Sequence, residues 1–231
     1  MVELKAWQRH RFGSANDQLE LVSLREIAGD AALRRSYVDM LRDFYAKDVK
    51  HRDDGTVIRG GDMAERFQGD NAWTPDRVAG NFYGYVSAQE ALAQPEPWRL
   101  PTHTAVLVNR DKAQAVGEAW IRTPDTLIPI TQWGGHTHSL IRPSARGSGF
   151  GSAMLPLSLA KAHELGVSEV HVSVNHDNPA SHRRFDAMVR EGRAAEVLTE
   201  PNHGRRHYTI QTALYAPDMK PASPNALARP I

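Results

Sequence analysis

The sequence predicts an α/β (α+β) fold, a single domain whose mixed, mostly antiparallel central sheet is flanked by helices. Apolar residues make up 41% and charged residues 24% of the 231 residues, which is ordinary for a globular protein that can bury a core. Strand-like and helix-like patterns follow one another in the order strand, two helices, three strands, helix, strand, helix and two strands. Strands joined directly favour antiparallel pairing, whereas the strand–helix–strand step over 135–174 predicts one parallel pair.

The first part of the chain supplies one strand and two helices. Residues 19–23 have the pattern of a short strand, and residues 31–48 place apolar side chains at spacings of three and four, which predicts a helix. Residues 49–72 are rich in Gly, Asp and Arg and predict a long loop. The Thr-Pro-Asp run at 74–76 offers an N-cap, a proline at the first helical position and an early acid, so a second helix is predicted over 75–93.

The second part of the chain completes the sheet. The predicted strands are 103–109, 113–121, 135–142, 169–174, 194–198 and 208–214, and the predicted helices are 149–165 and 179–190. This pattern places one domain at 19–216, between a polar N-terminal arm at 1–18 and a tail at 217–231 whose four prolines predict mobility.

Composition excludes several classes of function. The chain has 28 basic and 27 acidic residues, a formal charge of +1, so no nucleic-acid partner is expected. It has no cysteine, which excludes disulfides, thiolate metal sites and a cysteine nucleophile. The N-terminus lacks the apolar stretch of a signal peptide, and no run approaches the roughly 18 apolar residues of a membrane span. We therefore expect a cytoplasmic protein without a membrane partner.

A glycine-rich segment between a predicted strand and a predicted helix carries the chemistry. Glycines at 147, 149 and 151 let the main chain approach a ligand and adopt positive φ angles. The helix that begins there presents unpaired N–H groups and a positive dipole end, so the segment predicts an anion site. A Walker loop would need a lysine after the glycines, and the glycine spacing differs from the Rossmann fingerprint.

The segment matches the R-x-x-G-x-G signature of the GNAT superfamily through Arg146, Gly149 and Gly151. The helix that closes with Ala-Lys-Ala-His-Glu-Leu-Gly at Gly166, the strand Val170–Val174 and the run Asn-Pro-Ala-Ser at 178–181 also resemble this family. Upstream, Gly-Gly-His at 134–136 and Ile-Arg-Pro-Ser at 141–144 are similar to a subgroup of uncharacterised predicted acetyltransferases. The resemblance covers about residues 113 to 192 and identifies the chain as a member of the N-acyltransferases.

The resemblance implies an acyl-CoA donor, acetyl-CoA or another pantetheine thioester, as co-substrate. It implies that the strand ending at Arg142 and the strand 169–174 part to admit the pantetheine arm, which the main chain of Leu140 and Arg142 would pair with as a strand does. Amides from Gly147 to Ser152 would hold the diphosphate, and Asn178 would hydrogen-bond the arm near Ser181. The predicted donor-binding residues are Leu140, Ile141, Arg142, Arg146, Gly147, Ser148, Gly149, Phe150, Gly151, Ser152, Asn178 and Ser181.

Direct transfer to an amine needs a base. His136 and His138 lie two residues apart on one predicted strand, hence on one face, and histidine titrates near working pH. We expect His138 to be the base because it is nearer Leu140, with His136 second and Glu118, acting through a water, as an alternative. Two histidines are also consistent with simple packing, or with a metal if a third ligand existed; no metal is expected. Many family members have a tyrosine as general acid where this chain has Phe185, so another group such as Tyr208, or a water, would protonate the thiolate.

The acceptor is expected to be a small-molecule amine. Its pocket would be walled by Tyr45, Trp73, Tyr83 and Trp120, with Asp48, Asp53 and Asp54 available to attract a cation, although such residues are as often core or solvated loop. Two alternatives remain: a donor carried as phosphopantetheine on an acyl carrier protein, as in secondary-metabolite biosynthesis, and a non-catalytic acyl-CoA-binding module. A homodimer follows from family habit alone.

Overall fold

The structure is a computed structural model. It describes residues 18–48, 50–51, 57–59, 67, 72–96, 99–123, 135–197 and 204–216. The predicted N-terminal arm up to residue 17, most of the predicted 49–72 loop, and the predicted mobile tail from 217 onward lie outside the described residues, so the predicted domain limits stay a prediction. The chain divides into two compact units, the first made of 1–94, 103–119 and 139–154, and the second of 95–102, 120–138 and 155–231.

The first unit contains most of a four-stranded sheet. Its order is β1 (Leu19–Ser23), β4 (Thr102–Asn109), β5 (Gln114–Arg122) and β6 (Thr137–Ile141). Leu19 lies opposite Asn109, and β1 and β4 run antiparallel. Arg142 donates its amide to Val116, and Arg122 donates to His136, an order of partners that makes β5 and β6 antiparallel as well.

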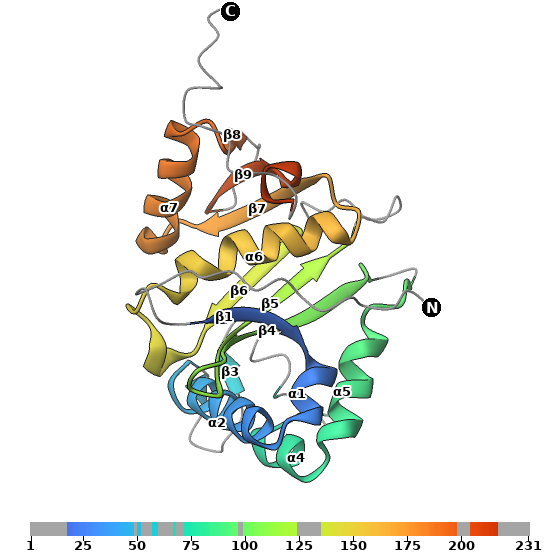
Figure 1. The fold of residues 1–231 in the computed structure, drawn as a ribbon. Coiled ribbons are helices and arrows are strands. Elements are labelled where there is room, and N and C mark those ends of the chain that lie inside the picture. Colours follow the sequence, from blue (N-terminus) through green and yellow to red (C-terminus); the bar gives the residue numbers. More distant parts are fainter. Residues whose placement is uncertain are drawn as a thin grey trace, which may run out of the picture. The chain divides into compact units, whose positions relative to one another are not determined.

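Four helices lie on one side of β1 and β4 (Figure 1). They are α1 (Leu24–Gly29), α2 (Ala31–Lys47), α4 (Pro75–Gly80) and α5 (Phe82–Ala91). The spacing of three and four in α2 buries Leu33, Tyr37, Met40, Leu41 and Phe44, as the sequence predicts. Two short strands, β2 (Lys50–His51) and β3 (Val57–Arg59), pair with each other.

Local capping explains two differences from the predicted helices. Ser23 and Glu26 form a capping box that starts α1, a helix that the sequence pattern did not predict. The predicted helix 75–93 is interrupted at Asn81, whose φ of −143° is not helical. The Asn81 side chain accepts a hydrogen bond from the Gly84 amide, so this residue ends α4 and caps α5.

The second unit contains a three-stranded antiparallel sheet in the order β7 (Glu169–Asn175), β9 (Arg205–Gln211) and β8 (Ala195–Val197). Helix α7 (Pro179–Arg190) contributes Phe185 and Met188 to the core of this unit, with Val170, Val172, Val174, Tyr208 and Ile210 from the strands. The predicted strand 208–214 ends at Gln211, and a 3₁₀ helix follows (η3, Thr212–Tyr215) because the buried Thr212 hydroxyl donates to the Val167 carbonyl at 2.6 Å.

The predicted parallel pair over 135–174 is wrong. In the described part of the chain β7 pairs with β9, and an antiparallel bridge joins Gly135 to Val172. At this bridge the His136 amide donates to the His171 carbonyl at 2.7 Å, and the His171 amide donates to the His136 imidazole at 2.9 Å in place of a strand carbonyl. The fold class itself is confirmed, because mixed helices and antiparallel sheets make up the structure. None of the helices in the described ranges has the length and apolar character needed to span a bilayer.

Candidate active site

The glycine-rich segment leaves β6 through a 3₁₀ turn (η2, Pro143–Ala145) and enters α6 (Phe150–Glu164), which contains Pro156. Gly147 and Gly149 adopt φ angles of +81° and +83°, which other residues rarely adopt. A Cβ atom at either glycine would meet no atom within 4 Å. Both glycines are therefore required by the conformation of the main chain, and both leave open space beside it.

The start of α6 has the properties of an anion site. The Gly149 carbonyl accepts the amides of Ser152 at 2.9 Å and Ala153 at 3.3 Å, which closes the first turn. The amides of Gly149, Phe150 and Gly151 form no hydrogen bond with the residues that the structure describes. Such first-turn amides, at the positive end of a helix dipole, fit the diphosphate of a pantetheine donor.

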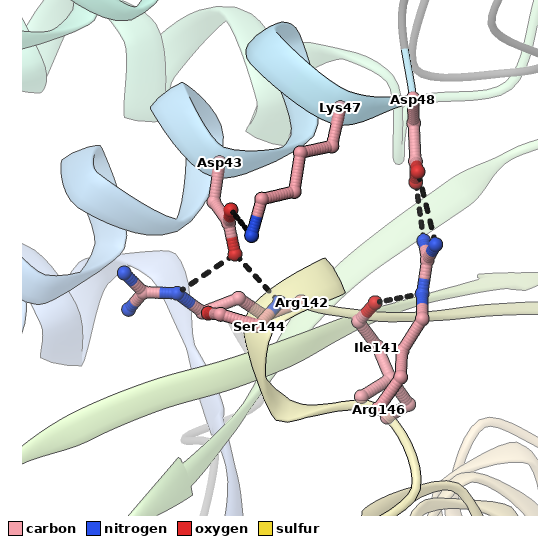
Figure 2. Close-up of polar contacts among 7 residues, drawn as sticks. All are labelled: Asp43, Lys47, Asp48, Ile141, Arg142, Ser144 and Arg146. Carbon is pink, nitrogen blue, oxygen red and sulfur yellow. Dashed lines mark hydrogen bonds and ion pairs between the residues drawn. The ribbon is translucent and has the colours of Figure 1, made fainter.

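Two aspartates of α2 contact the chain just before these glycines (Figure 2). Asp43 accepts the Ser144 amide at 2.8 Å and the Arg142 Nε at 3.4 Å, and pairs with Lys47 at 2.9 Å. Burial alone would raise the pKa of Asp43, but the hydrogen bonds from Ser144 and the charge of Lys47 hold that pKa well below its usual range.

Asp48, the residue that ends α2, pairs with Arg146. Arg146 Nη1 donates to Asp48 Oδ1 at 2.9 Å, Nη2 donates to the other carboxylate oxygen, and Nε donates to the Ile141 carbonyl at 3.1 Å. The carboxylate that the sequence offered as an attractor of a cationic amine is thus already paired. Neither contact with the donor loop was predicted, since each bond joins residues about a hundred positions apart.

The register of β6 decides which main-chain groups face its open edge. The Arg142 amide bonds to Val116 of β5, and the Leu140 carbonyl lies 2.6 Å from the position of a Cβ on Gly117. The Leu140 carbonyl and the Arg142 amide therefore point toward β5, whereas the Arg142 carbonyl accepts the Ala145 amide at 2.8 Å. Because the direction alternates along a strand, the main-chain groups of Ser139 and Ile141 point to the other edge.

His136 precedes β6 and lies in the second unit, as does its hydrogen-bond partner His171. Its Nδ1 accepts the His171 amide at 2.9 Å, so the neutral ring carries its proton on Nε2. Burial, then the neighbouring His171 and Arg122, lower the pKa of His136 to about 4. In this state His136 has no unused basic nitrogen.

His138 lies on β6 and stacks on Trp120 of β5, with ring centroids 5.4 Å apart and planes at 30°. His138 is half-buried, whereas Trp120 is buried. Trp120, which the sequence offers as a wall of the acceptor pocket, therefore supports the ring of His138.

Glu118 is the third predicted catalytic group and is buried in the first unit. Tyr37 of α2 donates its hydroxyl to Glu118 at 2.5 Å, and the hydroxyls of Tyr37 and Tyr85 lie 2.7 Å apart. All three residues are at most 1% exposed. The two tyrosines were not predicted as site residues, because periodicity marks them only as core.

The predicted pantetheine ligands of the second unit lie at the start of α7. The Asn178 side chain caps this helix by accepting the Ser181 amide at 3.1 Å, which leaves its NH₂ group for another partner. Phe185 stacks on Tyr208, with centroids 4.8 Å apart. Burial raises the pKa of the Tyr208 phenol to about 12, and this residue is 0% exposed. Its hydroxyl is therefore inaccessible from the surface to a leaving thiolate.

The other predicted acceptor residues differ in their surroundings. Tyr45 packs edge-on against Phe67, and Trp73 packs edge-on against Tyr85. Tyr83 is 65% exposed. Asp53 and Asp54 lie outside the described residues. Within the described ranges no group of three or more His, Cys, Asp or Glu side chains is arranged to hold a metal ion.

Comparisons with solved structures give distant matches. A chimera of the Vibrio cholerae spermidine N-acetyltransferase SpeG with hSSAT is 14% identical, with 85% of this chain and 97% of that chain covered and a TM-score of 0.47. The PaiA N-acetyltransferase of Thermoplasma acidophilum, in complex with coenzyme A, is 8% identical, with coverages of 84% and 98% and a TM-score of 0.42. The GNAT domain of PAT from S. lividans is 11% identical, with coverages of 84% and 90% and a TM-score of 0.43. Since each TM-score is below 0.5, none of these matches bears on the substrate.

The assignment to a family comes from the sequence. A comparison with curated protein sequences found no match. The profile of the acetyltransferase (GNAT) family, however, matches residues 72–188, which is just over half of the chain and includes the glycine-rich segment, β6 and most of α7. The chain therefore belongs to the acetyltransferase (GNAT) family and is an acyltransferase.

Proposed function

We propose that this enzyme moves an acyl group from acyl-CoA directly to the amine of a small molecule within a ternary complex. The observation that carries the proposal is the group of unpaired amides at Gly149, Phe150 and Gly151, beside two glycines with positive φ. A diphosphate satisfies such amides and is stabilised by the helix dipole. Family membership supports the thioester chemistry.

The donor binds mainly through the protein main chain. Amides from Gly147 to Gly151 hold the diphosphate, whereas the Ser152 amide, also predicted as a ligand, already donates to the Gly149 carbonyl. The pantetheine arm pairs with the edge of β6 that faces away from β5. On that edge Ser139 and the Ile141 amide supply the hydrogen bonds, because the Leu140 carbonyl and the Arg142 amide face β5 and the Ile141 carbonyl accepts Arg146 Nε. Asn178 and Ser181 stay predicted ligands of the arm.

Transfer requires that the amine nitrogen attack the thioester carbon, forming the C–N bond while the C–S bond breaks and the CoA thiolate leaves. His138 takes the proton that the ammonium must lose, and its stacking on Trp120 fixes the plane of the ring. Glu118, hydrogen-bonded by Tyr37, is the alternative base and would act through a water. An alkyl thiolate is a far weaker base than an alkoxide, so the CoA thiolate can leave without a general acid and take its proton from water, which accommodates Phe185.

The acceptor is a small-molecule amine whose structure is open, and Tyr45 and Trp73 stay predicted walls of its pocket. Nothing in the comparisons favours a carrier-protein donor or a homodimer. The cytoplasmic location likewise stays a prediction.

The test has two stages. Calorimetric titration with CoA should give saturable binding, and release of free thiol from acetyl-CoA should then be followed with a disulfide reagent across a panel of amines. Because the chain has no cysteine, this assay has no background from the protein. Absence of CoA binding would contradict the diphosphate site. With an amine substrate identified, His138→Ala and Glu118→Gln should differ: we expect the larger loss of kcat, about 100-fold, in His138→Ala, and the reverse order would transfer the role of base to Glu118.

A further inference from the structure

We propose that Asp48 is a positioning residue for the donor loop: it holds the Arg146 guanidinium as a brace between the end of α2 and β6. In this arrangement the Arg146 side chain fixes the loop and does not itself bind the diphosphate. The inference rests on the proposed function, since it concerns the same loop, but it makes a separate prediction about affinity.

The bonds of Arg146 are those of a structural brace. Each of its three side-chain nitrogens donates to an oxygen, two of them to the Asp48 carboxylate and Nε to the Ile141 carbonyl (Figure 2). This bidentate arrangement has the geometry of strong charge-assisted pairs. The Arg146 side chain is 48% exposed and that of Asp48 is 24% exposed, so the pair is partly accessible to solvent.

A second contact fixes the same stretch of chain one turn earlier on α2. Asp43, whose side chain is 11% exposed, accepts both the Ser144 amide and the Arg142 Nε. The segment 142–146 is thus attached to α2 at two points. The charges of these partners matter, because two carboxylates beside a diphosphate site would repel the donor if cationic side chains did not already neutralise them.

The loop benefits from such attachments because open space lies beside its glycines. A Cβ on Gly147 or Gly149 would meet no atom within 4 Å, and glycine has no side chain of its own with which to pack. Their placement depends on the anchored segment before them and on α6 after them. An Arg146 that left Asp48 to bind a phosphate would remove one of these anchors at the moment when the amides are needed.

The two possible roles of Arg146 predict opposite effects of Asp48→Asn. If Arg146 is a brace, loss of the carboxylate loosens the loop and weakens CoA binding. If Arg146 is a phosphate ligand, the carboxylate competes with the phosphate for it, and its loss strengthens CoA binding. Arg146→Lys separates the roles again, since lysine keeps the charge but cannot contact both Asp48 oxygens and the Ile141 carbonyl together.

The experiment is a calorimetric titration of CoA into the wild-type protein, Asp48→Asn, Arg146→Lys and the control Asp39→Asn. Asp39 forms an exposed pair with Arg42 on the same helix, at 3.1 Å, and has no contact with the loop in the described structure. We expect Kd to rise about two- to fivefold in Asp48→Asn and in Arg146→Lys, and to stay unchanged in the control. Once an amine is known, the KM for acetyl-CoA should rise by the same factor while kcat holds.

The outcomes separate this inference from the function on which it rests. A lower or unchanged Kd in Asp48→Asn overturns the brace, as does wild-type affinity in Arg146→Lys. Melting temperatures of the unliganded variants within about two degrees of wild type, together with the rise in Kd, exclude a general loss of structure and support it. A wild-type protein that binds no CoA would instead overturn the proposed function, and the brace with it.

Discussion

Acidification should destabilise the protein through His136, and the size of the effect follows from its surroundings. Burial and the nearby His171 and Arg122 lower the pKa of this imidazole to about 4, against 6.5 for an ordinary histidine. Between these values the unfolded chain binds a proton that the folded one does not, so stability falls as the pH falls. The difference of roughly 2.5 units corresponds to roughly 3 kcal/mol of unfolding free energy, intact above pH 6.5 and lost by pH 4.

The perturbation that isolates this effect is His136→Gln, whose side-chain carbonyl can still accept the His171 amide but does not titrate. Urea unfolding of both proteins at several pH values between 7 and 4 gives the free energy of unfolding of each. We expect the variant to be less stable at pH 7, by about 1 kcal/mol, because one well-packed ring is lost. Its deficit should vanish and then reverse on acidification. Parallel curves for the two proteins would refute the reasoning.

Three further predictions concern single residues. Gly117→Ala should destabilise the protein by about 1–3 kcal/mol in urea unfolding, because its Cβ would lie 2.6 Å from the Leu140 carbonyl, a main-chain atom that can move only with β6; unchanged stability would show that β6 yields easily. Asn178→Ala should cost about 1 kcal/mol by removing the cap that accepts the Ser181 amide, and Asn178→Ser should recover most of it in a thermal melt. Gly149→Asp should abolish CoA binding in calorimetry while circular dichroism stays that of the wild type, since it strains a position with positive φ and places a negative charge among the proposed diphosphate ligands; retained affinity would remove the loop from the site.

Much of the fold was predictable because it is encoded locally. The period of α2 and the alternation of the strands depend on the residues within each element, and these bounds agree to within a few positions. The split at Asn81 was missed because a single asparagine does not interrupt the helical pattern of the sequence. In the structure its side chain accepts the Gly84 amide, so Asn81 serves as a cap instead of continuing the helix. The parallel pair was wrong because β7 pairs with β9, and the described segment 135–141 meets β7 at an antiparallel bridge whose His171 amide bonds to a side chain.

The candidate site, like the fold, could be predicted only in part from the sequence. The glycine-rich segment was recognisable because its residue types follow from main-chain geometry, and positive φ at Gly147 and Gly149 agrees with that reasoning. Side-chain partners were not recognisable, because Asp43 and Asp48 meet Arg142 and Arg146 only after the chain has folded. Nor could the sequence decide which edge of β6 Leu140 faces, since a shift of one residue in register exchanges the two edges.

Several side chains that sequence reasoning missed lie on α2 or at its C-terminal end. Helix α2 carries Tyr37, which binds the buried Glu118, and Asp43 and Asp48, which hold the donor loop. At 1.5 Å per residue the span from Tyr37 to Asp48 is roughly 16 Å of rigid helix. A shift of α2 along its axis would therefore move Tyr37, the hydrogen-bond partner of Glu118, together with the two aspartates that hold the loop. Donor affinity and the environment of Glu118 should respond jointly to changes in α2, even at positions that touch neither.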